Sequence, residues 1–530
     1  MMMRMTQLVI GGVLCGIFMT TWVQAKTSDE QVGELHQAIS DWQTYEVRTQ
    51  LSELMAEEPQ HVGLRFVEAR LLFFEGDYVQ AVKRLDGLIA ELGDATPRSV
   101  TAFRTQVEKT RDALKGFDEF VSPDGRFLIR YTGRDKAILP YLLDVLKASD
   151  DALAADFMYR PKGRVVVEIY PEIKYLAAVS SLTETDIETS GTIALCKYNR
   201  LMFSSPRALV RGYGWRDTVS HEFVHYYVTK ASRNAVPIWL HEGIAKFQES
   251  RWRAEPGQPL APPQEDLLAR SLQADKLVTF EQMHPSMAKL PSQQAAGLAF
   301  AEVHTVVDHL HRSKGYQGIN ALLLNLKKGQ EMSRALKGVY GVTLDGLWSQ
   351  WKRALKKRGL KTYPGLVQQS LEFRRPGDPK KDEDKESNYG SIKEKSVRDF
   401  THLGELLRAR KRPKAALVEY KKAMTLGGEG NPLIQNGAAD ALLDLGRYQS
   451  VPETLTRVKR YYPGFMRTHL NLGKAYLKLG DMARAQAAFE AVIGINPFHP
   501  LPYMALPKLY DASNQPALAE RARRTLEILK

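Results

Sequence analysis

The C-terminal quarter of the chain repeats one pattern of small, large apolar and polar positions about every 34 residues. Small residues recur where paired helices would approach closely, large apolar residues recur on the facing side, and a Gly-containing pair marks the turn. The clearest copy consists of Leu472-Gly473, Tyr476, Gly480-Asp481, Ala485, Phe489 and Pro497. Earlier copies include Leu403-Gly404 and Ala439, and a degenerate copy covers 505–529. The pattern predicts stacked helical hairpins over residues 396–530.

A fainter version of the same pattern lies near the N-terminus. Leu35, Trp42, Leu51 and Leu54 have counterparts 34 positions later, and Gly76-Asp77-Tyr78 is typical of the turn into a second helix. Residues 26–118 are therefore predicted to form a helical domain. Its role is either to bind an extended partner or to pack against the domain that follows, and the pattern does not separate the two.

From Phe120 onwards the apolar positions follow strands as well as helices. Strands are expected at Phe120-Val121, Phe127–Tyr131, Val165–Tyr170, Thr192–Leu195 and Leu201–Phe203. Leu139–Phe157 has helical periodicity, and helices are expected from Pro237 to about Leu360. This order predicts an α+β domain over residues 119–360. The chain as a whole is therefore expected to be multidomain and mainly α.

Composition separates the α+β domain from the C-terminal hairpins and limits the partners. Residues 361–395 are predicted to be a charged linker, because Arg374–Lys395 has almost no large apolar residue and mixes both charge signs. The formal net charge of +13 favours anionic partners. No basic motif interleaved with aromatic residues supports nucleic-acid binding, so we expect no nucleic-acid partner. No basic amphipathic helix stands out either, and membrane-surface binding has the least support.

Residues 1–25 have the pattern of a secretory signal peptide. Arg4 supplies a positive start, 8–19 form a short apolar run, and Val23-Gln24-Ala25 is a small-residue cleavage site. The run is short for a membrane span, so the mature chain is expected to have no transmembrane segment, with envelope association left open. Cleavage leaves Cys196 as its one cysteine, for which a buried apolar role near a strand end is favoured. These features predict a bacterial periplasmic or secreted protein.

Two short motifs carry the candidate chemistry. His221-Glu222-Phe223-Val224-His225 is followed at close range by Trp239-Leu240-His241-Glu242-Gly243. If residues 217–231 are helical, His221 and His225 project from one face and can share one Zn²⁺. Glu222 lies beside them and could act on a metal-bound water. A lone histidine on such a helix more often packs or is solvated, but two glutamates at this spacing favour metal binding.

These residues resemble known families. The C-terminal pattern resembles tetratricopeptide repeats, and residues 26–118 look like a related pair of hairpins. The HExxH motif, followed by the segment from Trp239 to Ala245, resembles the gluzincin metallopeptidases and their peptidase-MA-like domain, over roughly residues 120–357. The resemblance implies a zincin-like fold with a mixed sheet and Glu242 as the third zinc ligand beside His221 and His225. It also implies that an edge strand, for which Thr192–Leu195 is the candidate, pairs with substrate.

The implied reaction is metal-assisted hydrolysis. Zn²⁺ lowers the pKa of a bound water toward ~7, and Glu222 accepts its proton and then protonates the leaving amine. His241 should point roughly 100° away from Glu242 on the helix and line the site. Glu249 returns to the face of Glu242, where it could orient a ligand histidine or make a solvent salt bridge, and Lys246 could pair with either glutamate.

One position departs from the family pattern. Relatives often carry Tyr-Ala where this chain has Phe300-Ala301, so a hydroxyl that could stabilise the oxyanion is absent here. His304, one turn on, is a candidate substitute, although a packed or surface histidine is favoured. The missing hydroxyl would affect the rate of hydrolysis but not the binding of the metal.

We therefore expect an exported zinc-dependent metallopeptidase that hydrolyses peptide bonds, with a polypeptide substrate and Zn²⁺ as its cofactor. The repeats would recruit substrate or partner proteins. Glu222 is the expected catalytic residue, and no residue is assigned to an organic cofactor. The alternative is a catalytically weak envelope scaffold that acts through its tetratricopeptide repeats.

Overall fold

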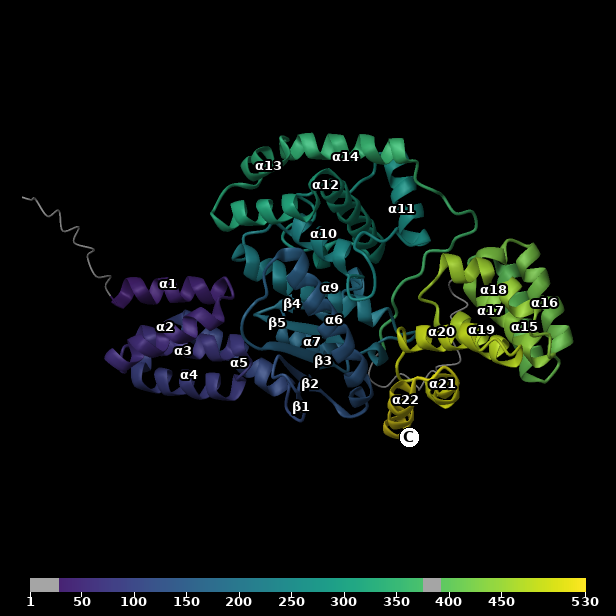
Figure 1. Cartoon of the computed structure of the whole chain (residues 1–530), viewed down its shortest axis with the longest axis horizontal. Coiled ribbons are helices and arrows are strands. Elements are labelled where there is room, and N and C mark those ends of the chain that lie inside the picture. Colours follow the sequence, from purple (N-terminus) through teal and green to yellow (C-terminus); the bar gives the residue numbers. More distant parts are fainter. Residues whose placement is uncertain (1–27, 375–391) are drawn as a thin grey trace, which may run out of the picture.

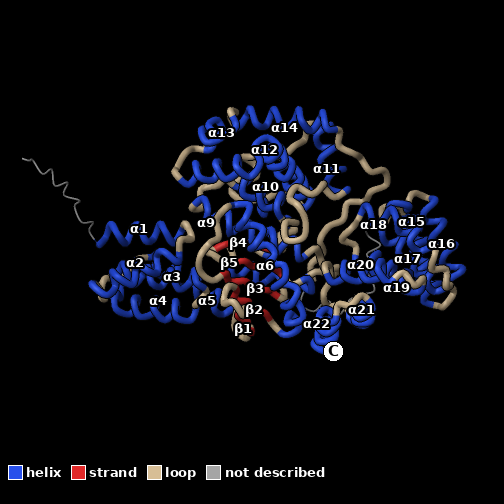
Figure 2. Tube along the Cα trace, viewed as in Figure 1, coloured by secondary structure: helices blue, strands red, loops and turns tan. Residues whose placement is uncertain are grey.

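The computed structural model describes residues 28–374 and 392–530 (Figure 1). The predicted signal peptide, residues 1–25, lies outside these ranges, as do residues 375–391 of the predicted linker. Helices occupy both ends of the molecule, and the described strands gather in the central part (Figure 2). This arrangement confirms the expected fold class. Within the described ranges, no helix has the length and apolar character needed to cross a bilayer.

Five helices form the N-terminal part, and each packs against its neighbour along the chain. They are α1 (Ser28–Ser40), α2 (Thr44–Glu57), α3 (Val62–Glu75), α4 (Tyr78–Leu92) and α5 (Arg98–Ala113). The expected turn between α3 and α4 forms. Gly76 ends α3 with a left-handed φ of 88°, and Asp77 caps α4 by accepting a hydrogen bond from the backbone N–H of Gln80 at 3.1 Å.

The central sheet has five strands in the order β1-β2-β3-β5-β4. Their bounds are β1 (Asp118–Val121), β2 (Phe127–Tyr131), β3 (Val165–Tyr170), β4 (Ala194–Lys197) and β5 (Arg200–Ser204). β2, β3 and β5 run parallel, whereas β1 and β4 are antiparallel to their neighbours, so the sheet is mixed as expected. β4 begins two residues later than the strand predicted at Thr192 and forms one edge of the sheet.

A buried ionic network joins the N-terminal helices to the sheet. Glu168 on β3 is fully buried and accepts hydrogen bonds from the hydroxyls of Tyr78 on α4 and Tyr170 at 2.6 and 2.5 Å. Arg130 on β2 and Arg200 on β5 approach its carboxylate at 3.2 and 3.3 Å. Burial alone would raise the pKa of Glu168, but the two guanidinium groups hold it below its usual value. The network fixes the position of α4 on the sheet.

Helices cover the sheet and complete the central part. They are α6 (Leu139–Phe157), α7 (Ile173–Val179), α8 (Glu184–Ser190), α9 (Trp215–Ser232), α10 (Ile238–Gln248), α11 (Pro262–Gln273), α12 (Gln293–Lys327), α13 (Met332–Tyr340) and α14 (Leu344–Arg358). The HExxH helix, α9, packs against α6, α10, α12 and the strands β4 and β5. α12 bends at Gly315, whose φ is 57°. From α10 to α14 the described chain forms helices and loops but no strand, as expected.

Four helical hairpins form the C-terminal part. Their helices are α15 (Lys395–Ala409), α16 (Pro413–Thr425), α17 (Pro432–Asp444), α18 (Ser450–Tyr461), α19 (Met466–Lys478), α20 (Met482–Ile493), α21 (Pro500–Ala512) and α22 (Pro516–Leu529). The small residue expected at position 473 allows α19 and α20 to approach closely. A Cβ atom on Gly473 would lie 2.7 Å from the ring of Phe489, so a larger residue would push the helices apart.

Both helical ends of the molecule contact α9. At the start of α9, the indole N–H of Trp215 donates to the carbonyl of Ile493 at 2.9 Å, and just before the helix the backbone N–H of Tyr213 donates to the carbonyl of Ile495 at 3.0 Å. At its end, the buried ammonium of Lys230 donates to the carbonyl of Trp42. The packing role considered for the N-terminal helices is thus present, and both flanking parts brace the HExxH helix.

The first part of the predicted linker packs against the protein. Tyr363 is buried, its backbone N–H donates to Asp266 on α11 at 2.7 Å, and its hydroxyl donates to Glu265 at 2.6 Å. Phe373 forms a β-bridge with Leu209. These residues were predicted as the start of a charged linker, but the apolar residues of 361–374 find partners on both the central and the C-terminal parts.

Candidate metal centre

The first motif lies on α9, which spans the predicted helix. His221 and His225 are four residues apart and therefore lie on one face, with their ring centroids 4.7 Å apart. Only 8% of His221 and 6% of His225 is exposed. The start of α9 is anchored in the core, because Trp215 is completely buried.

The second motif returns on α10 after a tight turn. Arg233 and Asn234 take left-handed φ values of 53° and 56°, and Pro237 immediately precedes the first helical residue. Gly243 then lets α10 approach α12, since a Cβ atom there would lie 2.7 Å from Val307 and 2.9 Å from the carbonyl oxygen of Val303. This close approach sets the position of the neighbouring residue, Glu242.

Three side chains from the two helices converge. Oε2 of Glu242 lies 3.2 Å from Nε2 of His221 and 3.2 Å from Nε2 of His225. The three ligand atoms all lie within 4.8 Å of one another. Two imidazoles and a carboxylate are the donor set that Zn²⁺ accepts in catalytic sites. The side chain of Glu242 is 21% exposed, more than that of either histidine.

Charges within this cluster stabilise one another. Burial by itself would lower the pKa of His221, but its contacts with Glu242 and Glu249 raise that pKa to about 10. Burial would raise the pKa of Glu242, but His225 and His221 hold it well below its usual value. A carboxylate with a strongly depressed pKa is ionised at neutral pH, which suits it to a cation. Binding of a metal by His221 must release the imidazole proton.

Glu222 lies beside the three converging groups. Only 5% of it is exposed, and burial raises the pKa of its carboxyl to about 7, although His225 and His221 oppose the rise. Its Oε2 atom is buried and has no hydrogen-bond partner among the described residues. An unpaired buried carboxylate oxygen is unfavourable unless a further group binds there. The donor set and this oxygen together fit a site for a hydrated divalent cation.

A glutamate that directly follows α10 supports the first histidine. Oε2 of Glu249 lies 3.5 Å from Nδ1 of His221, and its Oε1 accepts from Lys246 at 2.6 Å. The sequence left two roles open for Glu249, and the structure shows it beside the histidine. Because Nε2 of His221 faces Glu242, the contact through Nδ1 fixes the orientation of the ring.

His241 holds the second histidine in a way that helical spacing did not reveal. Its ring stacks on His225, with centroids 4.5 Å apart, and the two Nδ1 atoms lie 2.5 Å apart. Nε2 of His241 lies 3.0 Å from Oγ1 of Thr229. His241 is therefore turned away from the converging atoms, as expected, but it contacts the far side of His225. Thr229 follows His225 by four residues on α9, and that spacing could have pointed to it.

Phe300 and His304 on α12 have different surroundings. The ring of Phe300 packs edge-on against His221, with centroids 5.9 Å apart. Nδ1 of His304 faces the carbonyl oxygen of Lys246 at 3.4 Å, and its ring lies 6.0 Å from that of Phe247. His304 is thus a packed histidine, the interpretation that the sequence favoured.

Cys196, expected to be buried, is half-buried on β4.

Comparison with known proteins agrees with this arrangement. The model of the Peptidase MA superfamily matches residues 151–357, which include both motifs, and that of the tetratricopeptide repeat matches residues 467–499. The first match begins within α6, so β1 and β2 lie outside it. No curated protein matches the chain. This chain therefore contains a domain of the Peptidase MA superfamily, followed by a tetratricopeptide repeat.

Proposed function

We propose that the chain is a zinc-dependent metallopeptidase of the gluzincin type. The convergence of His221, His225 and Glu242 on one point carries this proposal. We also propose that it is exported, because residues 1–25 have the pattern of a signal peptide. Recovery of the mature chain from the periplasm or medium with its N-terminus near Lys26 would support export, whereas an intact Met1 in the cytoplasm would contradict it.

The side chains divide the work of hydrolysis. When bound, Zn²⁺ would supply Lewis acidity, polarising a substrate carbonyl and acidifying a water molecule. His221, His225 and Glu242 would hold the ion, and Glu249 and His241 would keep the two imidazole rings in place. Glu222, with its unpaired buried oxygen, would accept a proton and return it to the leaving amine. A nearby cation would lower its pKa from about 7 and keep it ready to accept.

The sheet offers a place for an extended substrate. β4 is an edge strand that pairs with β5 on one side and packs against α9, the helix that carries both histidines. An exposed strand edge can bind a peptide through main-chain hydrogen bonds. We propose that a substrate polypeptide adds to the sheet along β4.

One observation favours the alternative, a catalytically weak scaffold. Phe300 places an apolar ring against His221, where a hydroxyl could otherwise stabilise the developing oxyanion. Loss of one oxyanion donor lowers kcat by about 10²–10³-fold. A scaffold function would then rest on the helical repeats, with the metal centre serving stability.

Zinc content and casein hydrolysis test the proposal together. The purified protein is expected to hold one zinc ion per chain and to cleave casein, an unstructured substrate. A chelator should stop cleavage, and added Zn²⁺ should restore it. Stoichiometric zinc without cleavage would favour the scaffold. Cleavage that is indifferent to chelation, or a protein that takes up no zinc, would contradict the metallopeptidase.

Removal of the His241 ring is expected to weaken zinc binding by about 10–100-fold. When Nε2 of His225 binds the ion, Nδ1 carries the ring proton and donates to His241, whose own Nε2–H then donates to Thr229. Competition with a chromophoric chelator would measure the zinc Kd of His241→Ala, and His241→Asn should recover part of the loss. His469→Ala, which removes a buried histidine from α19, is the control. Equal affinities for wild type and His241→Ala would refute the supporting role.

A further inference from the structure

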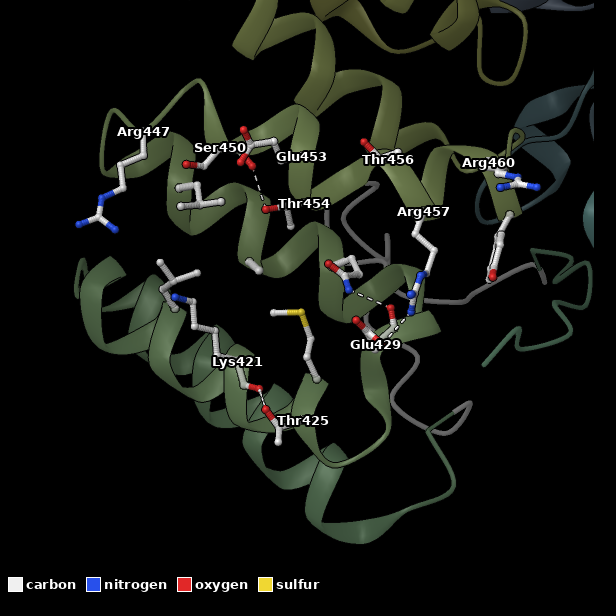
Figure 3. A pocket seen from close by; sticks show the side chains of 16 residues that line it. Lys421, Thr425, Glu429, Arg447, Ser450, Glu453, Thr454, Thr456, Arg457 and Arg460 are labelled. Carbon is white, nitrogen blue, oxygen red and sulfur yellow. Dashed lines mark hydrogen bonds and ion pairs between the residues drawn. The ribbon is translucent and has the colours of Figure 1, made fainter. Parts of the chain in front are cut away.

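The C-terminal hairpins carry a groove away from the metal centre (Figure 3). It lies between α16 and α18 and is floored by α17, with a volume of about 930 Å³. Its lining residues on α18 run from Ser450 to Tyr461, about 17 Å along the helix axis. A groove of this size and length can take a short polypeptide segment.

The opposite face of these repeats is engaged within the chain. Side chains on α15, α17 and α19, the first helices of successive hairpins, contact one another. Asn436 donates to the hydroxyl of Thr468 at 2.8 Å, and Asp440 pairs with Arg467 and with Arg408, the latter at 3.3 Å. Asn471 donates to Asn436 at 3.2 Å. The groove between the second helices, α16 and α18, is therefore the better candidate for binding a partner.

Charge decides which partner fits. The rim carries four basic side chains, Lys421, Arg447, Arg457 and Arg460, against two carboxylates, Glu429 and Glu453. Arg457 is neutralised by Glu429 at 2.7 Å. Lys421 and Arg447 have exposed side chains without a carboxylate partner in the part of the chain that the structure describes. Figure 3 shows Arg447 and Arg460 at opposite ends of the groove.

The floor adds an apolar requirement. Leu417 and Met424 from α16 and Leu442 from α17 line the groove between the charged rims. Leu417 and Leu442 are already buried, and Met424 is half-buried. A segment that alternates apolar and acidic residues can cover Met424 and pair with the rims, which a free anion or a uniformly charged polymer cannot do. We propose that this groove binds an acidic amphipathic polypeptide segment, through Lys421, Arg447 and Arg460 at its rims and the apolar floor between them.

The groove adjoins the connection to the central part. Tyr461 at its end packs edge-on against Tyr363, with ring centroids 5.4 Å apart, and Arg460 lies over the same ring at 5.8 Å. Tyr363 is in turn bonded to Glu265 on α11. A bound segment would thus lie beside the peptidase-type domain. Binding in the groove requires no metal, so this inference stands apart from the proposed hydrolysis.

Fluorescence anisotropy of the intact Glu222→Gln protein would test the groove without cleavage of the probe. The probe is a labelled peptide of about 15 residues with leucine at helical spacing and glutamate elsewhere. A peptide with lysine in place of glutamate, a polyglutamate of equal length and inorganic polyphosphate are the comparison ligands. We expect the acidic amphipathic peptide to bind best and its Kd to rise with salt.

Charge reversal in the groove should weaken that binding. Lys421→Glu combined with Arg447→Glu is expected to raise the Kd at least about tenfold. Lys414→Glu, a single charge reversal at an exposed position of α16 outside the groove, should leave it unchanged. If circular dichroism shows that the double variant is unfolded, Lys421→Gln with Arg447→Gln replaces it.

Three results of the binding assay would overturn the proposal. They are failure of the acidic amphipathic peptide to bind, equal Kd values for the groove variant and the wild type, and equal binding of polyglutamate or polyphosphate. The last would indicate a general anion surface. Light scattering that shows dimers dissociated by the groove variant would instead assign the groove to a second copy of this chain, and would likewise refute it.

Discussion

Glutamine in place of Glu222 is expected to lower kcat for peptide hydrolysis by about 10²–10⁴-fold while zinc stays bound. Glu222 is buried beside the converging atoms but is not one of them, and its Oε2 has no partner among the described residues. An amide of the same shape fills the same space but cannot take up a proton. The variant therefore separates proton transfer from metal binding.

Hydrolysis of a quenched fluorescent peptide and zinc content per chain, measured on the same preparations, would decide this prediction. Glu222→Asp is a useful companion, because it keeps the acid and shortens its reach, so an intermediate kcat is expected. An unchanged kcat in Glu222→Gln would place the proton acceptor elsewhere. Loss of zinc together with activity would indicate that Glu222 holds the ion or the fold.

Removal of the Glu242 carboxylate is expected to raise the zinc Kd by more than the ~100-fold typical of a residue that only supports a ligand. In the three-residue cluster, Glu242 supplies the negative charge and lies 3.2 Å from both His221 and His225. Glu242→Ala therefore removes a ligand together with the charge that balances the ion. Hydrolysis should fall with zinc occupancy. High zinc concentrations should recover it only in part, because the altered site would lack its original geometry.

Calorimetric titration with Zn²⁺ and a parallel peptide assay would test Glu242→Ala. Glu255→Ala is the matched control, because the side chain of Glu255 is 84% exposed and its one ion pair within the described residues is with Arg251 at 4.0 Å; surface pairs of this kind contribute little. A zinc Kd equal to that of the control would remove Glu242 from the metal centre. In that case the proposed three-residue site would be wrong.

The sequence predicted the helices that carry the site but not all contacts within it. Helical spacing correctly placed His221 and His225 on one face, and the polar break before Pro237 correctly indicated a second helix. The same spacing predicted that His241 points away from Glu242. It could not show that the ring of His241 stacks on His225. A helical period specifies the direction of a side chain relative to its own axis, whereas the neighbour that it meets depends on how two helices cross.

In the flanking parts too, local patterns predicted the helices but not the contacts between distant residues. Repeats of small and large residues predicted the hairpins at both ends, because each hairpin is stabilised by contacts between residues close in the chain. Residues 361–374 were predicted as part of a charged linker, but Tyr363 and Phe373 are held by residues about 100 or more positions away. No local pattern records such contacts.

Local patterns along the chain specify which elements form and which chemical groups they present: two imidazoles and a carboxylate on one helix, a further glutamate on the next, and helical repeats on either side. How these groups meet depends on packing between elements. Close packing at Gly243 brings Glu242 to the histidines, both flanking parts brace α9, and the groove opens between α16 and α18. The physical reason is that periodicity is a property of neighbouring residues, whereas a site or groove is formed by packing between residues far apart in the chain.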